Sequence, residues 1–171
     1  SASELDWSRV TVLLNDERWV DGASTRSNSR LLHRHLLRDK AQAAQYLDLY
    51  TGDATPEEAV PALTAAVAPH LPVTVLLLGM GADMHTASLF PSASETVLAL
   101  APDAPPVMAI RSVKDEPRIT LTASALRGAL NTHLLITGAD KREALERAQK
   151  LDPTEAPIRE FLGDITVHWA E

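Results

Sequence analysis

Two residues that could perform acid–base chemistry, Asp83 and His85, stand in a short polar loop that begins with two glycines. The apolar run before the loop, residues 73–78, predicts a buried strand, and ligands of parallel α/β sheets bind where such strands end. A neutral imidazole there can take a proton from water as the water attacks an ester-like carbonyl. We therefore predict His85 as a general base, with Asp83 either contacting substrate or bonding backbone amides of its own loop.

A second carboxylate and four cations complete the candidate site. Asp16 follows another predicted strand, residues 10–14, and should lie beside the His85 loop, where it would orient His85 or accept bonds from substrate hydroxyls. The alternative is a helix cap or a surface carboxylate. Guanidinium groups and a lysine suit a phosphate monoester, although such cations are often solvated or paired with acids. The cationic candidates are Arg18, Arg26, Arg118 and Lys141.

Other catalytic patterns are not supported. Ser88 lacks the G-x-S-x-G surroundings of an esterase nucleophile, so we do not expect an acyl-serine mechanism. His33 and His35 are two apart on a predicted helix and face different sides, which makes them poor joint metal ligands. We expect neither a metal nor an organic cofactor, because an ester-like carbonyl needs only activated water and charge stabilisation.

The elements that must position these residues alternate between strands and helices along the chain. We therefore predict a layered α/β fold with a largely parallel twisted sheet flanked by helices, formed by residues 1–171 as a single domain. A polar loop is expected at 15–28, and a helix-like segment is expected to begin at Thr86. Besides 10–14 and 73–78, strands are expected at 107–110, 119–121, 133–137 and 165–169; helices are expected at 27–37, 55–67, 122–130 and 140–150, with a helical turn at 157–162.

The composition limits the class of partner. A chain of 171 residues, 45% hydrophobic and 23% charged, has the make-up of a globular domain. Its net charge is −7 and no lysine–arginine run occurs, which argues against a nucleic-acid partner. The absence of cysteine excludes disulfides and fits a cytoplasmic location. No apolar stretch reaches membrane-spanning length, so no membrane partner is expected, and the oligomeric state stays open.

Four blocks of the sequence, in order, resemble motifs of the 6-phosphogluconolactonases. Residues 16–20 with 26–28 are similar to D-E-R-W-V and R-S-N, and residues 79–91 are similar to G-x-G-x-D-G-H-x-A-S-L-F-P. Residues 118–122 match R-I-T-L-T, and residues 138–141 match G-x-x-K. The second block departs from the family at Met84, where the family carries glycine. If that glycine has a positive φ, Met84 adds strain of about 1–2 kcal/mol; otherwise the exchange is harmless packing.

The resemblance implies the fold of the glucosamine-6-phosphate deaminases and isomerases. It also implies hydrolysis of a phosphorylated sugar lactone, 6-phosphogluconolactone, to 6-phosphogluconate in the oxidative pentose phosphate pathway. His85 would be the general base, and Arg118 and Lys141 lie on blocks associated with substrate and phosphate contact. Two related functions stay open, glucosamine-6-phosphate deamination and non-catalytic sensing of sugar phosphates. The stretch Ser88 to Pro91 argues against the deaminase, which carries asparagine, glutamate and proline there.

The family's opening strand and its glycine- and serine-rich phosphate loop precede the D-E-R-W-V block, which here begins at Asp16. We therefore expect an N-terminally shortened domain without that strand and loop. A sheet of this kind should have an open edge or an exposed apolar face. We expect residues 1–171 alone to be poorly soluble or to need the missing segment.

Overall fold

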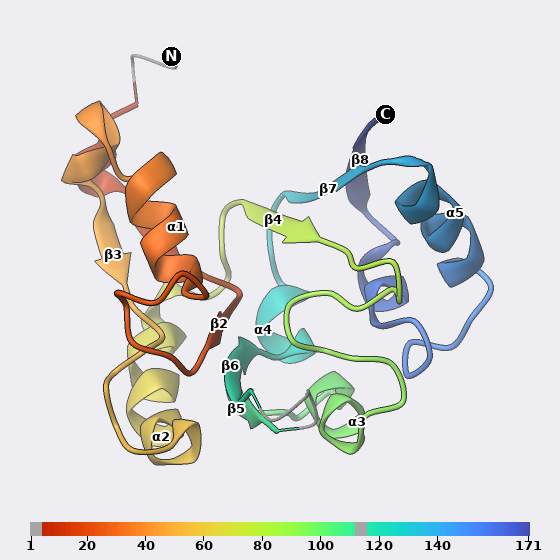
Figure 1. Cartoon of the computed structure of the whole chain (residues 1–171), viewed down its shortest axis with the longest axis horizontal. Helices are drawn as coiled ribbons and strands as arrows, with labels where there is room; N and C mark the ends of the chain where they lie inside the picture. Colours follow the sequence, from red (N-terminus) through yellow and green to blue (C-terminus); the bar gives the residue numbers. More distant parts are fainter. Residues whose placement is uncertain (1–4, 112–115) are drawn as a thin grey trace.

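A computed structural model describes residues 5–111 and 116–171 of the chain (Figure 1). The strands form three small sheets among these residues. Parallel pairing joins β1 (Thr11–Leu13) to β3 (Gln45–Leu47), and joins β4 (Leu76–Gly79) to β7 (Thr132–Thr137) and β7 to β8 (Ile165–Ala170). The third sheet is antiparallel, with β6 (Arg118–Leu121) between β2 (Asp16–Arg18) and β5 (Val107–Ile110).

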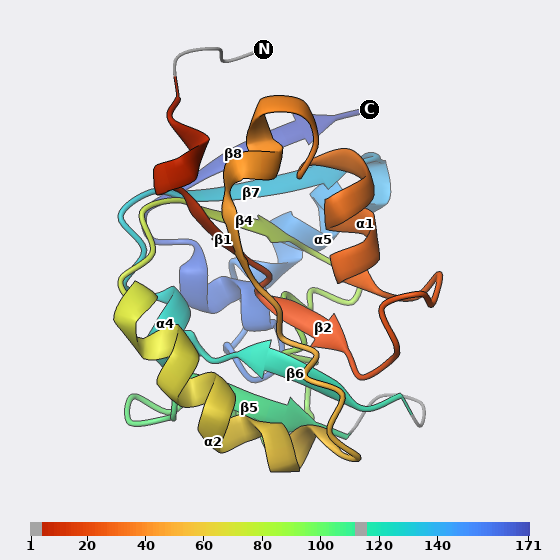
Figure 2. The same cartoon turned by 90° about the vertical axis from the view of Figure 1, so that its left-hand side faces the viewer.

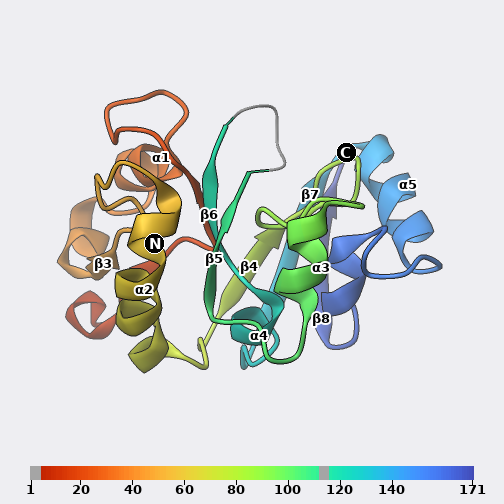
Figure 3. The same ribbon diagram turned by 90° about the horizontal axis from the view of Figure 1, so that it is seen from below.

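Helices cover the sheets on several sides. The α-helices are α1 (Asn28–His35), α2 (Pro56–Val67), α3 (Ser94–Leu100), α4 (Ala123–Leu126) and α5 (Ala139–Ala148). Short 3₁₀ turns occupy Trp7–Arg9, Asp39–Ala43, Ala68–His70 and Pro157–Phe161. Figure 2 shows α2 lying across the β5–β6 pair, and Figure 3 shows this pair between α2 and α3. None of the helices in the described part of the chain has the length and apolar character needed to cross a membrane.

The β4–β7–β8 sheet has one buried and one exposed face because its apolar residues alternate. Leu78 and Leu134 are fully buried and share the core with Leu145 of α5. On the other face, the side chains of Leu77 and Leu135 are 57% and 51% exposed. One face of this sheet therefore presents apolar side chains to solvent, and poor solubility stays a prediction.

The α/β class and the parallel pairing of β4, β7 and β8 are confirmed. The predicted loop at 15–28 is wrong in part, because β2 lies within it and pairs with β6. The helix-like segment predicted from Thr86 is also wrong. An isolated bridge joins Thr86 to Leu89, and Ala87 adopts a left-handed φ of 48° that ends any regular helix there. Within the described residues, the prediction did not include the strands β2 and β3, the helix α3, or the 3₁₀ turns at 7–9 and 39–43.

Candidate active site

The loop after β4 folds back on itself within a few residues. The Gly81 amide donates a hydrogen bond to the His85 carbonyl at 3.0 Å, and the Met84 amide donates to the Gly81 carbonyl at 2.9 Å. The Thr86 hydroxyl donates to the carbonyl of Gly79, the last residue of β4, at 2.9 Å. These bonds fix the backbone of His85 at the carboxyl end of the strand, where the sequence predicts it.

The imidazole of His85 is held by the nearby carboxylate of Asp83. His85 Nδ1 lies 2.5 Å from Asp83 Oδ1, and the His85 amide donates to the same oxygen at 3.2 Å. An ionised carboxylate only accepts hydrogen bonds, so Nδ1 carries the proton and the lone pair of a neutral ring resides on Nε2. The side chain of His85 is 32% exposed, so the ring is accessible to solvent. Asp83, rather than Asp16, orients this ring.

Gly81 is required by this arrangement. A Cβ atom added at Gly81 would overlap the His85 ring and the Asp83 carboxylate, whereas a Cβ at Gly79 meets no atom within 4 Å. Met84 has a φ of 70°, which is the left-handed conformation that favours glycine. The sequence left two alternatives for Met84, backbone strain or harmless packing. The positive φ shows that the strained alternative holds.

Phe90 connects His85 to the cationic part of the site. Its ring centroid lies 4.7 Å from that of the imidazole, with 34° between the planes. The guanidinium carbon of Arg118 lies 5.4 Å from the same Phe90 ring. Phe90 therefore packs between the histidine loop and β6, with a cation–π contact on one side.

Ser88, three residues after His85, connects that part of the chain to Asp16. The Ser88 hydroxyl is buried and donates to Asp16 Oδ2 at 2.7 Å. One guanidinium nitrogen of Arg118 lies 3.7 Å from the same oxygen. The Ser88 hydroxyl therefore donates its proton to Asp16 and fixes that carboxylate.

Three of the four predicted cations form one group, which we call the arginine cluster: Arg18, Arg26 and Arg118. Arg18 and Arg118 are directly paired across β2 and β6, and Arg18 donates to the carbonyl of Arg26 at 2.6 Å. Arg26 directs two nitrogens onto Glu116, at 2.9 Å and 2.6 Å, and Arg118 donates to Glu116 at 3.1 Å.

The electrostatics of the cluster follow from burial and proximity. Burial, followed by the charge of Arg18, lowers the pKa of Arg118 from its ordinary value. The hydrogen bonds and charge of Arg26 lower the pKa of Glu116. Among the described residues, Arg18 Nε and Arg118 Nε are buried and have no hydrogen-bond partner. The cluster thus keeps buried donors that an anion could satisfy.

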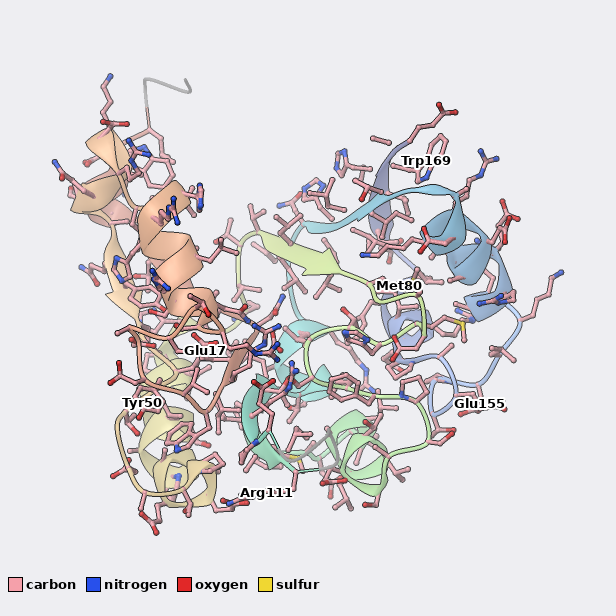
Figure 4. The ribbon with its side chains drawn as sticks, viewed as in Figure 1. Glu17, Tyr50, Met80, Arg111, Glu155 and Trp169 are labelled. Carbon is pink, nitrogen blue, oxygen red and sulfur yellow. The ribbon has the colours of Figure 1, made fainter. Side chains whose placement is uncertain are left out.

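Glu17 is fully buried at the foot of α1 and holds this region together (Figure 4). Its carboxylate accepts the backbone amides of Asn28 and Ser29, at 2.8 Å and 2.7 Å, and the Ser27 hydroxyl at 3.1 Å. Ser27 in turn caps the helix by accepting the Arg30 amide at 3.1 Å. A carboxylate at a helix N-terminus satisfies free N–H groups and is favoured by the helix dipole. Glu17 therefore has a structural role.

Lys141 stands apart from the arginine cluster. It lies in the first turn of α5, directly after the carboxyl end of β7. Because β4 and β7 are parallel neighbours, this turn begins at the same edge of the sheet as the His85 loop. Among the described residues, no cluster of three or more histidine, cysteine or acidic side chains is arranged to hold a metal ion.

Sequence reasoning missed the contacts that Phe90, Glu116 and Ser88 make. Glu116 is two residues before Arg118, and in an extended segment residues two apart share a face, so this spacing could have indicated the pairing. The contacts of Phe90 and Ser88 join distant parts of the chain, and no local pattern signals them.

Comparison with known proteins identifies the relatives of this chain. Residues 1–169 match the model of the family described as glucosamine-6-phosphate isomerases/6-phosphogluconolactonase. A 6-phosphogluconolactonase of Pseudomonas aeruginosa is 41% identical over 181 residues, covering 99% of this chain and 73% of the relative. The crystal structure of a 6-phosphogluconolactonase from Shewanella baltica superposes with a TM-score of 0.93 at 32% identity, covering 99% of this chain and 75% of the other.

A solved structure with a different activity has a similar fold. A monomeric glucosamine-6-phosphate deaminase superposes with a TM-score of 0.77, at 14% identity, covering 98% of this chain and 75% of the deaminase. This likeness concerns the fold alone.

Proposed function

This chain belongs to the family of glucosamine-6-phosphate isomerases and 6-phosphogluconolactonases, and we propose that it hydrolyses 6-phosphogluconolactone to 6-phosphogluconate. The observation that carries the proposal is the pairing of His85 Nδ1 with Asp83 at 2.5 Å. Because Nδ1 is bonded to Asp83, the basic nitrogen of the neutral ring is Nε2, and the ring is accessible to solvent. Such an enzyme would meet its substrate in the cytoplasm.

His85 acts as the general base in this proposal. Nε2 takes a proton from a water molecule while the water oxygen bonds to the lactone carbonyl carbon. The Asp83 carboxylate, bonded to Nδ1–H, stabilises the imidazolium that forms. The carbon–oxygen bond of the ring then breaks, and the imidazolium returns the proton to the departing ring oxygen. The products are a carboxylic acid and a hydroxyl group, and His85 is restored.

The arginine cluster binds the phosphate group of the substrate. Its guanidinium groups present two buried Nε–H donors and the forked donors of Arg26, which suit a phosphate. Lys141 contributes a further positive charge from the edge of the sheet shared with the His85 loop. Asp16, fixed by Ser88 and Arg118, accepts a hydrogen bond from a substrate hydroxyl.

The test of turnover is the release of acid from freshly prepared 6-phosphogluconolactone, measured above its spontaneous hydrolysis. The chain should accelerate release, and His85→Ala should remove the acceleration while circular dichroism shows an intact fold. His35→Ala, at an exposed position in the last turn of α1, is the matched control and should behave as the unmodified chain. Turnover retained in His85→Ala would contradict the mechanism.

The phosphate site is tested separately with Arg26→Gln. We expect KM for the lactone to rise about tenfold, because a charge-assisted bond to the phosphate is lost. Arg111→Gln is the matched control: Arg111 forms an equally forked pair with Glu57, at 2.7 Å and 2.7 Å, at the end of β5 outside the cluster (Figure 4). An equal rise of KM in both variants would remove Arg26 from the phosphate site.

A further inference from the structure

The arginine cluster already holds an anion that belongs to the chain itself. Arg26 places both arms of its guanidinium group on Glu116, and Arg118 donates to the same carboxylate. One carboxylate that bridges two guanidinium groups makes the charge-assisted bonds that a phosphate group would make in its place. Glu116 therefore occupies the position of an anionic ligand.

This internal ion pair is open to exchange. The side chains of Arg26 and Glu116 are 58% and 21% exposed, so their separation requires no change in the apolar core. Water competes for the Arg26 side of the pair and weakens it, whereas the Arg118 side, at 11% exposure, is more shielded. Arg18 Nε and Arg118 Nε, by contrast, are buried donors that Glu116 leaves without a partner among the described residues. An incoming anion that reaches them gains bonds that Glu116 does not make.

The charges favour a dianion as the incoming ligand. The three arginines, opposed by Asp16 and Glu116, have a formal net charge of plus one. If Glu116 leaves, the remaining charge of plus two equals that needed to neutralise a phosphate dianion. A monoanion that replaces the Glu116 carboxylate brings the same single charge, so it gains no electrostatic advantage over Glu116. Glu116 itself is ionised near neutral pH, since Arg26 lowers its pKa.

We propose that Glu116 is an internal competitor of the substrate's phosphate group: it binds Arg26 and Arg118 in the free chain and releases them to the phosphorylated lactone. This inference rests on the proposed function, because it assigns the phosphate of that substrate to the arginine cluster. The competition raises KM, and it selects dianionic ligands over monoanions. Glu116 is a specificity residue and takes no part in the proton transfers of His85.

The experiment compares Glu116→Gln with the unmodified chain. The amide keeps the shape of the side chain and removes its charge. We expect KM for the lactone to fall about two- to fivefold, the range that an exposed ion pair supplies, with the effect on KM and not on kcat. Inorganic phosphate, added as a competitive inhibitor, should bind more tightly by a similar factor. Glu57→Gln, which breaks the matched pair with Arg111, should change neither quantity.

A KM that is unchanged or raised in Glu116→Gln would overturn the inference, since a raised value would mean that Glu116 holds the arginines in place. Thermal unfolding of the variant, and of Glu116→Ala as a second form, checks the fold. Calorimetric titration with inorganic phosphate requires no turnover and separates the two proposals. If the chain does not hydrolyse the lactone but Glu116→Gln binds phosphate more tightly, the proposed activity fails and the competition stands. If hydrolysis occurs and phosphate binding is equal, only the competition fails.

Discussion

The two halves of the candidate site are built in different ways. In the His85 loop, the decisive contact joins residues two apart in sequence, Asp83 and His85, and the surrounding bonds lie between Gly79 and Thr86. In the arginine cluster, Arg26 bonds Glu116 across 90 positions, and Ser88 bonds Asp16 across 72. The loop depends on local backbone geometry, and the cluster depends on the pairing of β2 with β6.

This difference separates the expected effects of mutation. A change at Gly81, Asp83 or His85 acts on the imidazole without removing apolar contacts from the core, so it should lower kcat and leave stability largely intact. A change in the cluster or its support disturbs the pairing of distant segments, so it should affect ligand binding and stability together. Each of the following variants tests one side of this division.

Gly81→Ala should have the largest effect. A Cβ at this position overlaps the His85 ring and Asp83, so the ring must move. A displacement of about 1 Å at a catalytic group costs about 100-fold in rate, and we expect a loss of kcat of this size. Gly79→Ala is the control, because its Cβ would lie in open space two residues earlier. Steady-state kinetics of both variants check this; equal kcat values would show that the ring tolerates the methyl group.

Glu17→Gln tests the support of the cluster. Each oxygen of the buried Glu17 carboxylate accepts a hydrogen bond from a backbone amide at the start of α1. A glutamine side chain has only one acceptor oxygen, so it cannot accept both bonds in the same way. We expect a loss of about 2 kcal/mol in the free energy of unfolding, as for an unsatisfied buried polar group. Urea unfolding followed by circular dichroism measures it. Full stability would mean that solvent or a shift of α1 compensates.

The same division explains what the sequence could predict. The glycines, Asp83 and His85 form one continuous block after an apolar run, so local pattern was sufficient to locate the histidine and the strand before it. Strand β2 has three residues and its middle residue is a buried glutamate, so no alternation of apolar and polar residues revealed it. Its partner β6 follows about 100 residues later. Pairing at such separation is decided by tertiary packing, which short-range patterns do not encode.

For the same reason, the sequence identified the three arginines without showing that they form a cluster. Each matched a motif, but Arg26 and Arg118 are joined through Glu116, and Arg18 joins them through the carbonyl of Arg26. One of the two roles that the sequence leaves open for Asp16, the orientation of His85, has a similar basis. Asp16 lies beside the loop, but Asp83 is closer to the ring because the turn at Gly81 folds the chain back.

Asp83→Asn should reduce kcat about tenfold, a smaller effect than that of Gly81→Ala. The amide oxygen can still accept the Nδ1–H of His85, so the ring keeps its orientation but loses the charge that stabilises the imidazolium. Asp83 is 56% exposed, and solvent screening limits the loss. Asp152→Asn is the control, since Asp152 forms a similar turn with the Thr154 amide at 2.9 Å, outside the site. A decrease in kcat shared by both variants would point to the turn rather than to the imidazolium.

Met84 provides the smallest and most local test, through two variants compared with each other. Both Met84→Gly and Met84→Ala remove the thioether, which packs against the core, but only glycine accepts a φ of 70° without strain. The left-handed conformation costs an alanine about 1 kcal/mol, so the glycine variant should be more stable than the alanine variant by about that amount. Thermal unfolding of the pair measures the difference. Equal stabilities would mean that the loop relaxes when the side chain is shortened, and the backbone of residue 84 would then not constrain His85.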